Sequence, residues 1–163
     1  DDGKPVVLYL TSKGYEPGQK NGPRTWRTSR WTGTAWETRD LTTSDHNYDH
    51  GSLYVEAGRW RVLATTDPGP QPHGTGGELV LWETANRGDS WTRVRSVTQG
   101  SALNHSYPRR PLNAHPGFHA LWADGNPLEP SDSRLYITNR DGDAVWRLPA
   151  RMDADTARPE LVK

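Results

Sequence analysis

Short apolar segments recur along the chain, and each is bounded by glycine, proline, asparagine or aspartate. They are rich in β-branched and aromatic residues, which favours β-strands. No long stretch repeats its apolar residues with the period of a helix. The clearest segments span residues 6–11, 24–28, 61–66, 79–83, 118–122 and 134–138. The pattern therefore predicts an all-β protein.

The segments repeat at a constant interval, marked by the equally spaced Trp36, Trp91 and Trp146. A glycine three or four residues before each tryptophan predicts a tight hairpin with positive φ, and the tryptophan is expected to fill the space beneath the next strand. Four strands in a period of about 40 to 55 residues are typical of a β-propeller blade. The interval superposes two sets of strand residues: Leu8, Leu63 and Phe118, and Trp26, Leu81 and Tyr136.

The repeat predicts about three blades of four antiparallel strands, at residues 1–44, 45–99 and 100–149, followed by a tail at 150–163. The first blade begins directly in a segment that aligns with second strands, so we expect it to lack its innermost strand. In the tail, residues 160–162 suit a short edge strand. Propellers close with about 4 to 8 blades. We therefore expect the C-terminal part of a larger propeller, completed by further blades, by another copy or by another polypeptide.

The turn of the middle repeat resembles a known structural motif. Residues 84–91 are similar to the Asp-box of sialidase-type propellers, Ser/Thr-x-Asp-x-Gly-x-x-Trp, with Asn86 in place of the usual aspartate. Asparagine keeps a side-chain oxygen that can cap the turn. Because the motif belongs to the outer hairpin of a blade, we expect a structural role for it.

Composition narrows the possible partners. The chain has no cysteine, which excludes disulfides and thiolate metal sites. Lys and Arg number 20, as do Asp and Glu, so the formal net charge is zero, and neither nucleic acid nor a membrane surface is indicated as a partner. No apolar run approaches the roughly 20 residues of a membrane span, and no signal-like segment starts the chain. The hydrophobic fraction of 32% is low, so the eight tryptophans are expected to carry much of the core.

Two segments that join neighbouring blades contain the side chains that proton transfer requires. Residues 41–51 and 97–106 are expected to lie over one mouth of the propeller, beside its axis. The first segment places two histidines, a tyrosine and two aspartates within residues 45–50. The repeat superposes residues 49–50 on 104–105, so each blade offers an acid or amide followed by histidine.

The second segment continues into a strand that carries histidine, tyrosine and paired arginines. Side chains alternate along a strand, which predicts that His105, Tyr107 and Arg109 point to one side. Ser106 and Arg110 are then expected on the other side. Histidine, tyrosine and arginine at one mouth are suited to proton transfer and to binding an anion.

A long loop at residues 67–77, rich in glycine and proline, joins a second strand to a third strand. Such loops are expected to rise over the same mouth. The loop would then bring His73 and glycine backbone N–H groups close to a ligand.

Three stretches, residues 45–54, 68–78 and 104–111, resemble the BNR-4 repeat family of bacterial and fungal propellers, and the resemblance extends over residues 6–149. It implies a seven-bladed propeller of which this chain covers the last three blades. The family includes polysaccharide lyases that cleave uronic-acid glycans such as ulvan and rhamnose–glucuronate linkages. The resemblance therefore implies a polysaccharide or oligosaccharide substrate and an extracellular or periplasmic location. No cofactor is indicated, and a structural Ca²⁺ stays open.

A lyase of this kind needs a cation to neutralise the uronate carboxylate, a base to remove the proton at C5 and an acid to protonate the departing O4. Arginine binds a carboxylate in bidentate fashion, and histidine titrates near neutrality. The predicted catalytic residues are His50, His105, Tyr107 and Tyr48, and the predicted substrate-binding residues are Arg109, Arg110, His46, His73 and Asn104. The activity is expected to require the missing blades or a partner chain.

Other readings of the same residues stay open. Residues 45–50 also suit a polar loop with hydrogen-bonded histidines or a metal site, although the helical spacing that supports many metal sites is absent. His115 and His119 suit structural roles in a turn and a strand. A sialidase-like glycoside hydrolase would need two carboxylates across the bond, with Asp45, Asp49 and Asp124 as the candidates. A non-catalytic glycan-binding propeller would stack exposed aromatic rings on sugars.

Overall fold

The computed structural model describes residues 2–46, 49–56 and 58–163, and its regular structure is almost entirely β. Within this part of the chain one short 3-10 turn, η1 (Gln19–Asn21), accompanies the strands. The strands are β1 (Val6–Thr11), β2 (Arg24–Trp31), β3 (Trp36–Ser44), β4 (Ser52–Glu56), β5 (Arg59–Asp67), β6 (Glu78–Thr84), β7 (Thr92–Ser96), β8 (Asn104–Arg109), β9 (Ala120–Gly125), β10 (Leu135–Thr138), β11 (Val145–Arg147) and β12 (Glu160–Leu161). The all-β prediction is confirmed.

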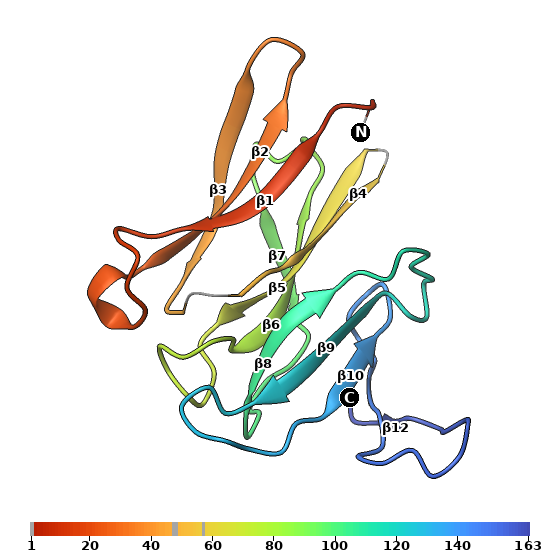
Figure 1. Ribbon diagram of the computed structural model, residues 1–163. Coiled ribbons are helices and arrows are strands. Elements are labelled where there is room, and N and C mark those ends of the chain that lie inside the picture. Colours follow the sequence, from red (N-terminus) through yellow and green to blue (C-terminus); the bar gives the residue numbers. More distant parts are fainter. Residues whose placement is uncertain (1, 47–48, 57) are drawn as a thin grey trace.

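The strands form three antiparallel sheets, and in each sheet neighbours in sequence are neighbours in space (Figure 1). The first sheet contains β1 to β3, the second β4 to β7, and the third β8 to β12. β1 and β3 lie against β4 and β5, while β8 lies against β5 and β6. The second sheet therefore lies between the other two. Closure of these sheets into a propeller stays a prediction.

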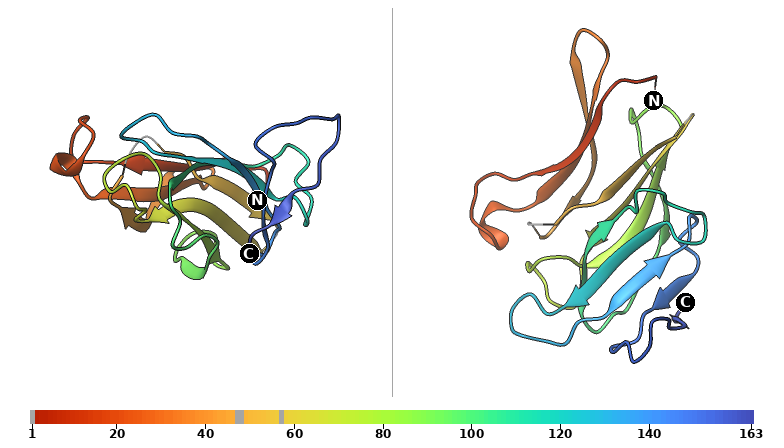
Figure 2. Two further views of the ribbon diagram at one scale, coloured as in Figure 1. Left: turned by 90° about the horizontal axis from the view of Figure 1, so that it is seen from below. Right: turned by 45° about the vertical axis from the view of Figure 1, so that its right-hand side comes forward.

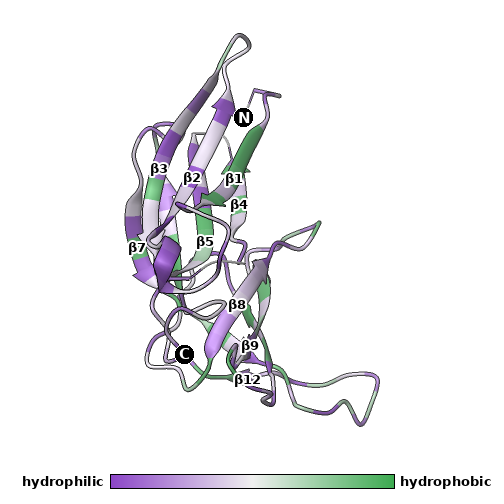
Figure 3. Ribbon diagram, turned by 60° about the vertical axis from the view of Figure 1, so that its left-hand side comes forward, coloured by the Kyte–Doolittle hydropathy of each residue, from purple (hydrophilic) through white to green (hydrophobic). Residues whose placement is uncertain are grey.

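The middle strands of the second sheet, β5 and β6, are largely buried, and the sequence of β5 explains why. Consecutive residues of β5 point to opposite faces of the sheet, and both faces carry apolar side chains. Val62 packs with Trp26 of the first sheet, and Leu63 packs with Trp122 of the third sheet. Outer strands are more polar: β3 is largely hydrophilic, in contrast to the hydrophobic β1 (Figure 3). The two inter-sheet cores fix how the sheets sit against one another.

The glycines of the repeated turns have the expected conformation. Gly33, Gly88 and Gly142 all have positive φ, at 111°, 89° and 66°. The expectation for the evenly spaced tryptophans is wrong at Trp36, which is 52% exposed. Trp36 directly follows its turn and pairs with Trp31 across the hairpin, so its ring packs along the sheet at 5.5 Å between centroids.

Different tryptophans supply the buried rings. The fully buried tryptophans are Trp26, Trp60 and Trp122, whose exposed fractions are at most 2%. Each lies within or at the start of a strand that is covered by a neighbouring sheet. The prediction that tryptophan carries much of the core is therefore met by these three residues.

The sequence alignment of the second strands needs a correction. The repeat superposes Trp26, Leu81 and Tyr136, and each of them pairs with a residue of the preceding strand. These partners are Leu10, Leu63 and Trp122, which are therefore equivalent in the sheets. The constant sequence interval instead superposes Leu8, Leu63 and Phe118. Phe118 precedes β9 and is 40% exposed. The connections between strands differ in length, so a constant sequence interval does not superpose equivalent residues in every sheet.

The C-terminal segment leaves the third sheet after β11, passes through an exposed loop and returns as β12 (Figure 2). Trp146 pairs with Leu161, and Arg147 pairs with Glu160. Arg147 also makes an ion pair with Glu160 at 2.6 Å. The expected edge strand is therefore present in the tail.

Candidate functional site

An imidazole, a phenol and a guanidinium meet at the exposed junction of the second and third sheets. The ring centroids of His50 and Tyr107 are 5.9 Å apart. The guanidinium carbon of Arg109 lies 5.6 Å from the centre of the Tyr107 ring, within the range of a cation–π contact. All three side chains are exposed. His50 directly precedes the second sheet, whereas Tyr107 and Arg109 belong to β8.

Tyr107 takes an unusual backbone conformation that turns its side chain toward His50. Its φ is 52°, in the left-handed region, and the ladder between β8 and β9 shifts register between Ser106 and Arg109. Such a bulge interrupts the alternation of side chains. The prediction that His105 and Tyr107 share one side is therefore wrong: His105 is 4% exposed and faces Trp122, while Tyr107 faces His50.

A buried carboxylate joins the two parts of this site. Oδ1 of Asp49 accepts hydrogen bonds from the backbone N–H groups of His50 at 2.6 Å and of Tyr107 at 2.8 Å. Oδ2 accepts a hydrogen bond from the hydroxyl of Thr65. Burial raises the pKa of Asp49 above its ordinary value, and the hydrogen bonds from Thr65 and the backbone act against that rise. The sequence pattern named Asp49 as a neighbour of His50 and as a candidate carboxylate of a hydrolase, and it gave no signal for Thr65.

His46 lies behind Asp49 and has no exposed surface. Its Nδ1 lies 3.4 Å from Oδ1 of Asp45, and its Nε2 lies 3.8 Å from Oδ2 of Asp49. The hydrogen bond with His46 holds the pKa of Asp45 below its ordinary value. A side chain in this position cannot contact a substrate, so His46 supports the site from within. Tyr48, the remaining candidate of this segment, lies outside the described residues.

The loop at 68–77 reaches the same site from the second sheet. The backbone N–H of His73 donates to Oδ2 of Asp45 at 3.3 Å, and His73 itself is half-buried with a φ of 62°. The phenol of Tyr107 shares a hydrogen bond with Thr75. Burial, followed by the charge of Asp49, raises the pKa of Tyr107 above its ordinary value. Sequence reasoning missed Thr75.

Asn104 holds this loop in place. Its Nδ2 donates to the carbonyls of Gln71 at 2.9 Å and Thr75 at 3.1 Å, and its Oδ1 accepts from the N–H of Gln71 at 3.1 Å. Asn104 is 1% exposed. The structure therefore gives Asn104 a role in positioning the loop, and its amide is buried.

The ring nitrogens of His105 are both engaged in a buried network. Nδ1 accepts the indole N–H of Trp122 at 2.9 Å, so the hydrogen of the neutral ring lies on Nε2. Nε2 then donates to the hydroxyl of Ser101 at 2.9 Å, and that hydroxyl donates to Glu78 at 2.9 Å. Burial lowers the pKa of His105. The ring has no free lone pair for a base and no free proton for an acid.

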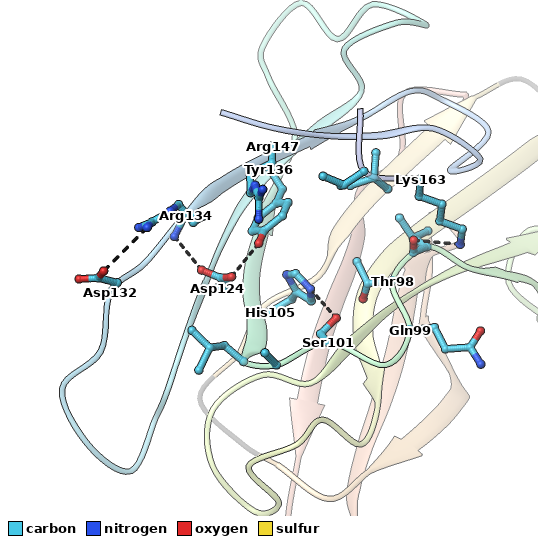
Figure 4. Close-up of a pocket in the computed structure, with 15 residues that line it drawn as sticks. Thr98, Gln99, Ser101, His105, Asp124, Asp132, Arg134, Tyr136, Arg147 and Lys163 are labelled. Atoms are coloured by element: carbon cyan, nitrogen blue, oxygen red, sulfur yellow. Dashed lines mark hydrogen bonds and ion pairs between the residues drawn. The ribbon is translucent and has the colours of Figure 1, made fainter. Parts of the chain in front are cut away.

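His105 also borders a cavity of about 590 Å³ between the second and third sheets (Figure 4). Across it, the hydroxyl of Tyr136 donates to Asp124 at 2.8 Å, and the backbone N–H of Arg134 donates to the same carboxylate at 2.7 Å. Burial and Asp124 raise the pKa of Tyr136 to about 12. The polar groups of His105, Tyr136 and Asp124 that border the cavity are therefore already paired.

Arg110 is separated from Arg109 by its contacts. Its guanidinium carbon lies 5.1 Å from the centre of the Tyr54 ring. Tyr54 stacks on His119 at 3.9 Å and donates its hydroxyl to the backbone carbonyl of His119. Burial lowers the pKa of His119 to about 4. His119 therefore has the structural position that the sequence indicated, and Arg109 is the guanidinium beside Tyr107.

The motif that resembles an Asp-box forms a self-contained turn between β6 and β7. Thr84 donates its hydroxyl to Oδ1 of Asn86 at 2.6 Å, and the same oxygen accepts the backbone N–H of Ser90 at 3.0 Å. The N–H of Gly88 donates to the Thr84 hydroxyl at 3.2 Å. These bonds lie within the hairpin, as expected for a structural element.

Within the described residues, no three carboxylate or imidazole groups gather in a way that could hold a metal ion. Among the same residues, none of the helical structure is long and apolar enough to cross a membrane.

Comparisons with protein-family models, curated proteins and solved structures find no match to this chain.

Proposed function

We propose that this chain is part of a carbohydrate-active β-propeller that cleaves a uronic-acid-containing glycan by β-elimination. The observation that carries the proposal is the meeting of His50, Tyr107 and Arg109 at one exposed junction. These side chains provide a base, an acid and a cation, which are the three groups that the reaction requires. The proposal implies a polysaccharide or oligosaccharide substrate and an extracellular or periplasmic location.

Each of the three side chains has one role in the proposed reaction. The guanidinium of Arg109 pairs with the uronate carboxylate and makes the proton at C5 more acidic. His50 removes that proton, the electron pair forms the C4–C5 double bond, and the C4–O4 bond breaks. Tyr107 gives its phenolic proton to O4. Burial and the charge of Asp49 raise the pKa of Tyr107, so the phenol is protonated near neutral pH and has a proton to give.

The propeller part of the proposal rests on the repeated architecture. Each sheet is an antiparallel meander, successive sheets pack side by side, and the aligned glycines occupy equivalent turns. In a propeller, the first strands β4 and β8 would line the axis, and the site would face the central channel. Further blades would complete the ring and contribute further substrate contacts.

A hydrolase receives less support from the same geometry. Asp49 has no exposed side-chain surface, and both oxygens of Asp124 accept hydrogen bonds from Arg134 and Tyr136. A glycosidase needs two carboxyl groups that reach opposite sides of the scissile bond. The carboxylates that the sequence suggested are instead committed to the scaffold.

Product analysis tests the proposal directly. The complete propeller, which is this chain together with the blades or the partner chain that close it, is incubated with ulvan and with other glucuronate-containing glycans. A lyase produces unsaturated uronate ends that absorb in the ultraviolet. New reducing ends without that absorbance would identify a hydrolase, and binding without turnover would identify a glycan-binding propeller; either result would overturn the lyase proposal.

A further inference from the structure

We infer that Asp49 is a positioning residue that holds His50 and Tyr107 together across the junction of the second and third sheets. This inference rests on the proposed function for its catalytic meaning. Its structural basis is the pair of hydrogen bonds that one oxygen of Asp49 accepts from the backbone N–H groups of both residues. No other described residue is seen to accept a hydrogen bond from both N–H groups.

β8 has an irregular backbone at Tyr107. The φ of this residue is 52°, in the left-handed region that is unfavourable for an L-residue of this size. Its N–H points out of the β8–β9 ladder, since the register shifts at this point. Asp49 supplies the acceptor that this N–H would otherwise lack, at 2.8 Å. The carboxylate thereby stabilises the bulge that turns the phenol toward His50.

The position of the carboxylate itself is fixed. Thr65, in β5, donates its hydroxyl to Oδ2, and the buried ring of His46 lies 3.8 Å from the same oxygen. Asp49 is therefore held from behind by the core of the second sheet. Movement of the carboxylate would have to break these contacts as well.

A second carboxylate holds the loop at 68–77 in a similar way. On the far side of His46, Asp45 accepts the N–H of His73, which is also a non-glycine residue with positive φ, at 62°. Two carboxylates that flank one buried histidine thus each hold a strained residue of the site. This repetition indicates that Asp45, His46 and Asp49 together hold the surrounding groups in place.

The consequence for the proposed reaction is geometric. A base and an acid on one substrate must both lie within hydrogen-bonding reach of their atoms, and a misplacement of about 1 Å can cost about a hundredfold in rate. His50 and Tyr107 come from different sheets, so their separation depends on what joins the sheets locally. Asp49 makes the connection that reaches both His50 and Tyr107, beside the bond that the Ser52 hydroxyl donates to the carbonyl of Pro108 at 2.8 Å.

The test compares Asp49→Leu, which removes the acceptor, with Asp49→Asn, whose amide oxygen can still accept both N–H groups. Glu78→Gln is the matched control, because Glu78 is also a buried carboxylate that accepts hydrogen bonds, from Ser101. Two quantities are measured on the complete propeller that contains this chain. One is kcat and KM for release of unsaturated uronate, and the other is the nuclear Overhauser contact between the ring protons of His50 and Tyr107.

For Asp49→Leu we expect the ring contact to disappear and kcat to fall about a hundredfold, with a smaller change in KM. Asp49→Asn should keep the contact and recover most of kcat, and Glu78→Gln should change neither. A folded Asp49→Leu variant that keeps both would overturn the inference. If Asp49→Leu does not fold, Thr65→Val, which removes one support of the carboxylate, should weaken the contact; an unchanged contact and kcat would overturn it equally.

The two readouts separate this inference from the proposed function. If the complete wild-type propeller releases no unsaturated product, the lyase proposal fails. The ring contact still decides whether Asp49 positions His50 and Tyr107, because it requires no turnover.

Discussion

Trp122 donates its indole N–H to Nδ1 of His105 at 2.9 Å. The sequence repeat superposes His105 on His50, but this bond gives His105 a different environment. The bond fixes the tautomer of His105, and Ser101 accepts the hydrogen on the other nitrogen. His50 has an exposed ring beside Tyr107. Only His50 is therefore free for proton transfer in the proposed reaction.

The first prediction concerns the stability that this network supplies. His105→Gln should lower the free energy of unfolding by roughly 1 to 3 kcal/mol, because the indole N–H of Trp122 loses its buried acceptor. Urea denaturation measures the change. Ser101→Ala should act in the same direction by a smaller amount. An unchanged midpoint for His105→Gln would show that the network does not stabilise the fold.

A second prediction concerns the phenol of Tyr107. Tyr107→Phe should lower kcat about a hundredfold through loss of the acid, with little change in stability, because the exposed ring is kept. In the wild-type protein, the raised pKa of Tyr107 keeps the phenol protonated. At any pH below about 10, kcat should therefore show no loss from deprotonation of Tyr107. Tyr9→Phe, which removes a remote hydroxyl bonded to Ser29, is the control and should leave kcat intact. Equal rates for the two variants would exclude Tyr107 as the acid.

A third prediction concerns the loop that Asn104 holds. Asn104→Ala should cost about 1 to 3 kcal/mol of stability and expose the segment 68–77 to proteolysis, because several buried loop groups lose their partners. Limited digestion followed by mass spectrometry locates the cuts. Asn86→Ala, in the remote hairpin, serves as the comparison. Cleavage at the same sites and rates in both variants would contradict the role given to Asn104.

The fourth prediction concerns pH. Burial lowers the pKa of His119 from 6.5 to about 4, so the unfolded chain binds a proton more readily than the folded chain between these values. The contribution of His119 to stability is therefore present above about pH 6.5 and is lost as the pH falls toward 4, by on the order of 1 kcal/mol for each unit. The groups facing His119 are Glu56, Arg61, Arg110 and Arg140.

His119→Phe isolates this effect. Among the described residues, none hydrogen bonds to Nε2 of His119, so phenylalanine can keep the stack on Tyr54 without leaving a polar group unpaired. The variant should lose less stability than the wild type between pH 6.5 and pH 4 in thermal unfolding. Parallel pH profiles for the two proteins would show that His119 does not titrate in this way.

The sequence predicts the sheets better than the site. Alternating apolar residues and the glycines of the repeated turns depend on local chain geometry, so strands and hairpins follow directly from the pattern. The site depends on the bulge at Tyr107, where strand alternation fails. Pro108 is the one local signal, since proline within a strand is often found at a bulge. The choice between His50 and His105 depends on Trp122, a contact between strands that the interval misaligned.

The measurement that tests the central claim most directly compares His50→Gln and His105→Gln in one assay of unsaturated uronate release. We predict that the complete wild-type propeller releases product, that His50→Gln lowers kcat about a hundredfold, and that His105→Gln changes kcat by less than about threefold. Loss of turnover in His105→Gln with full turnover in His50→Gln would contradict the account.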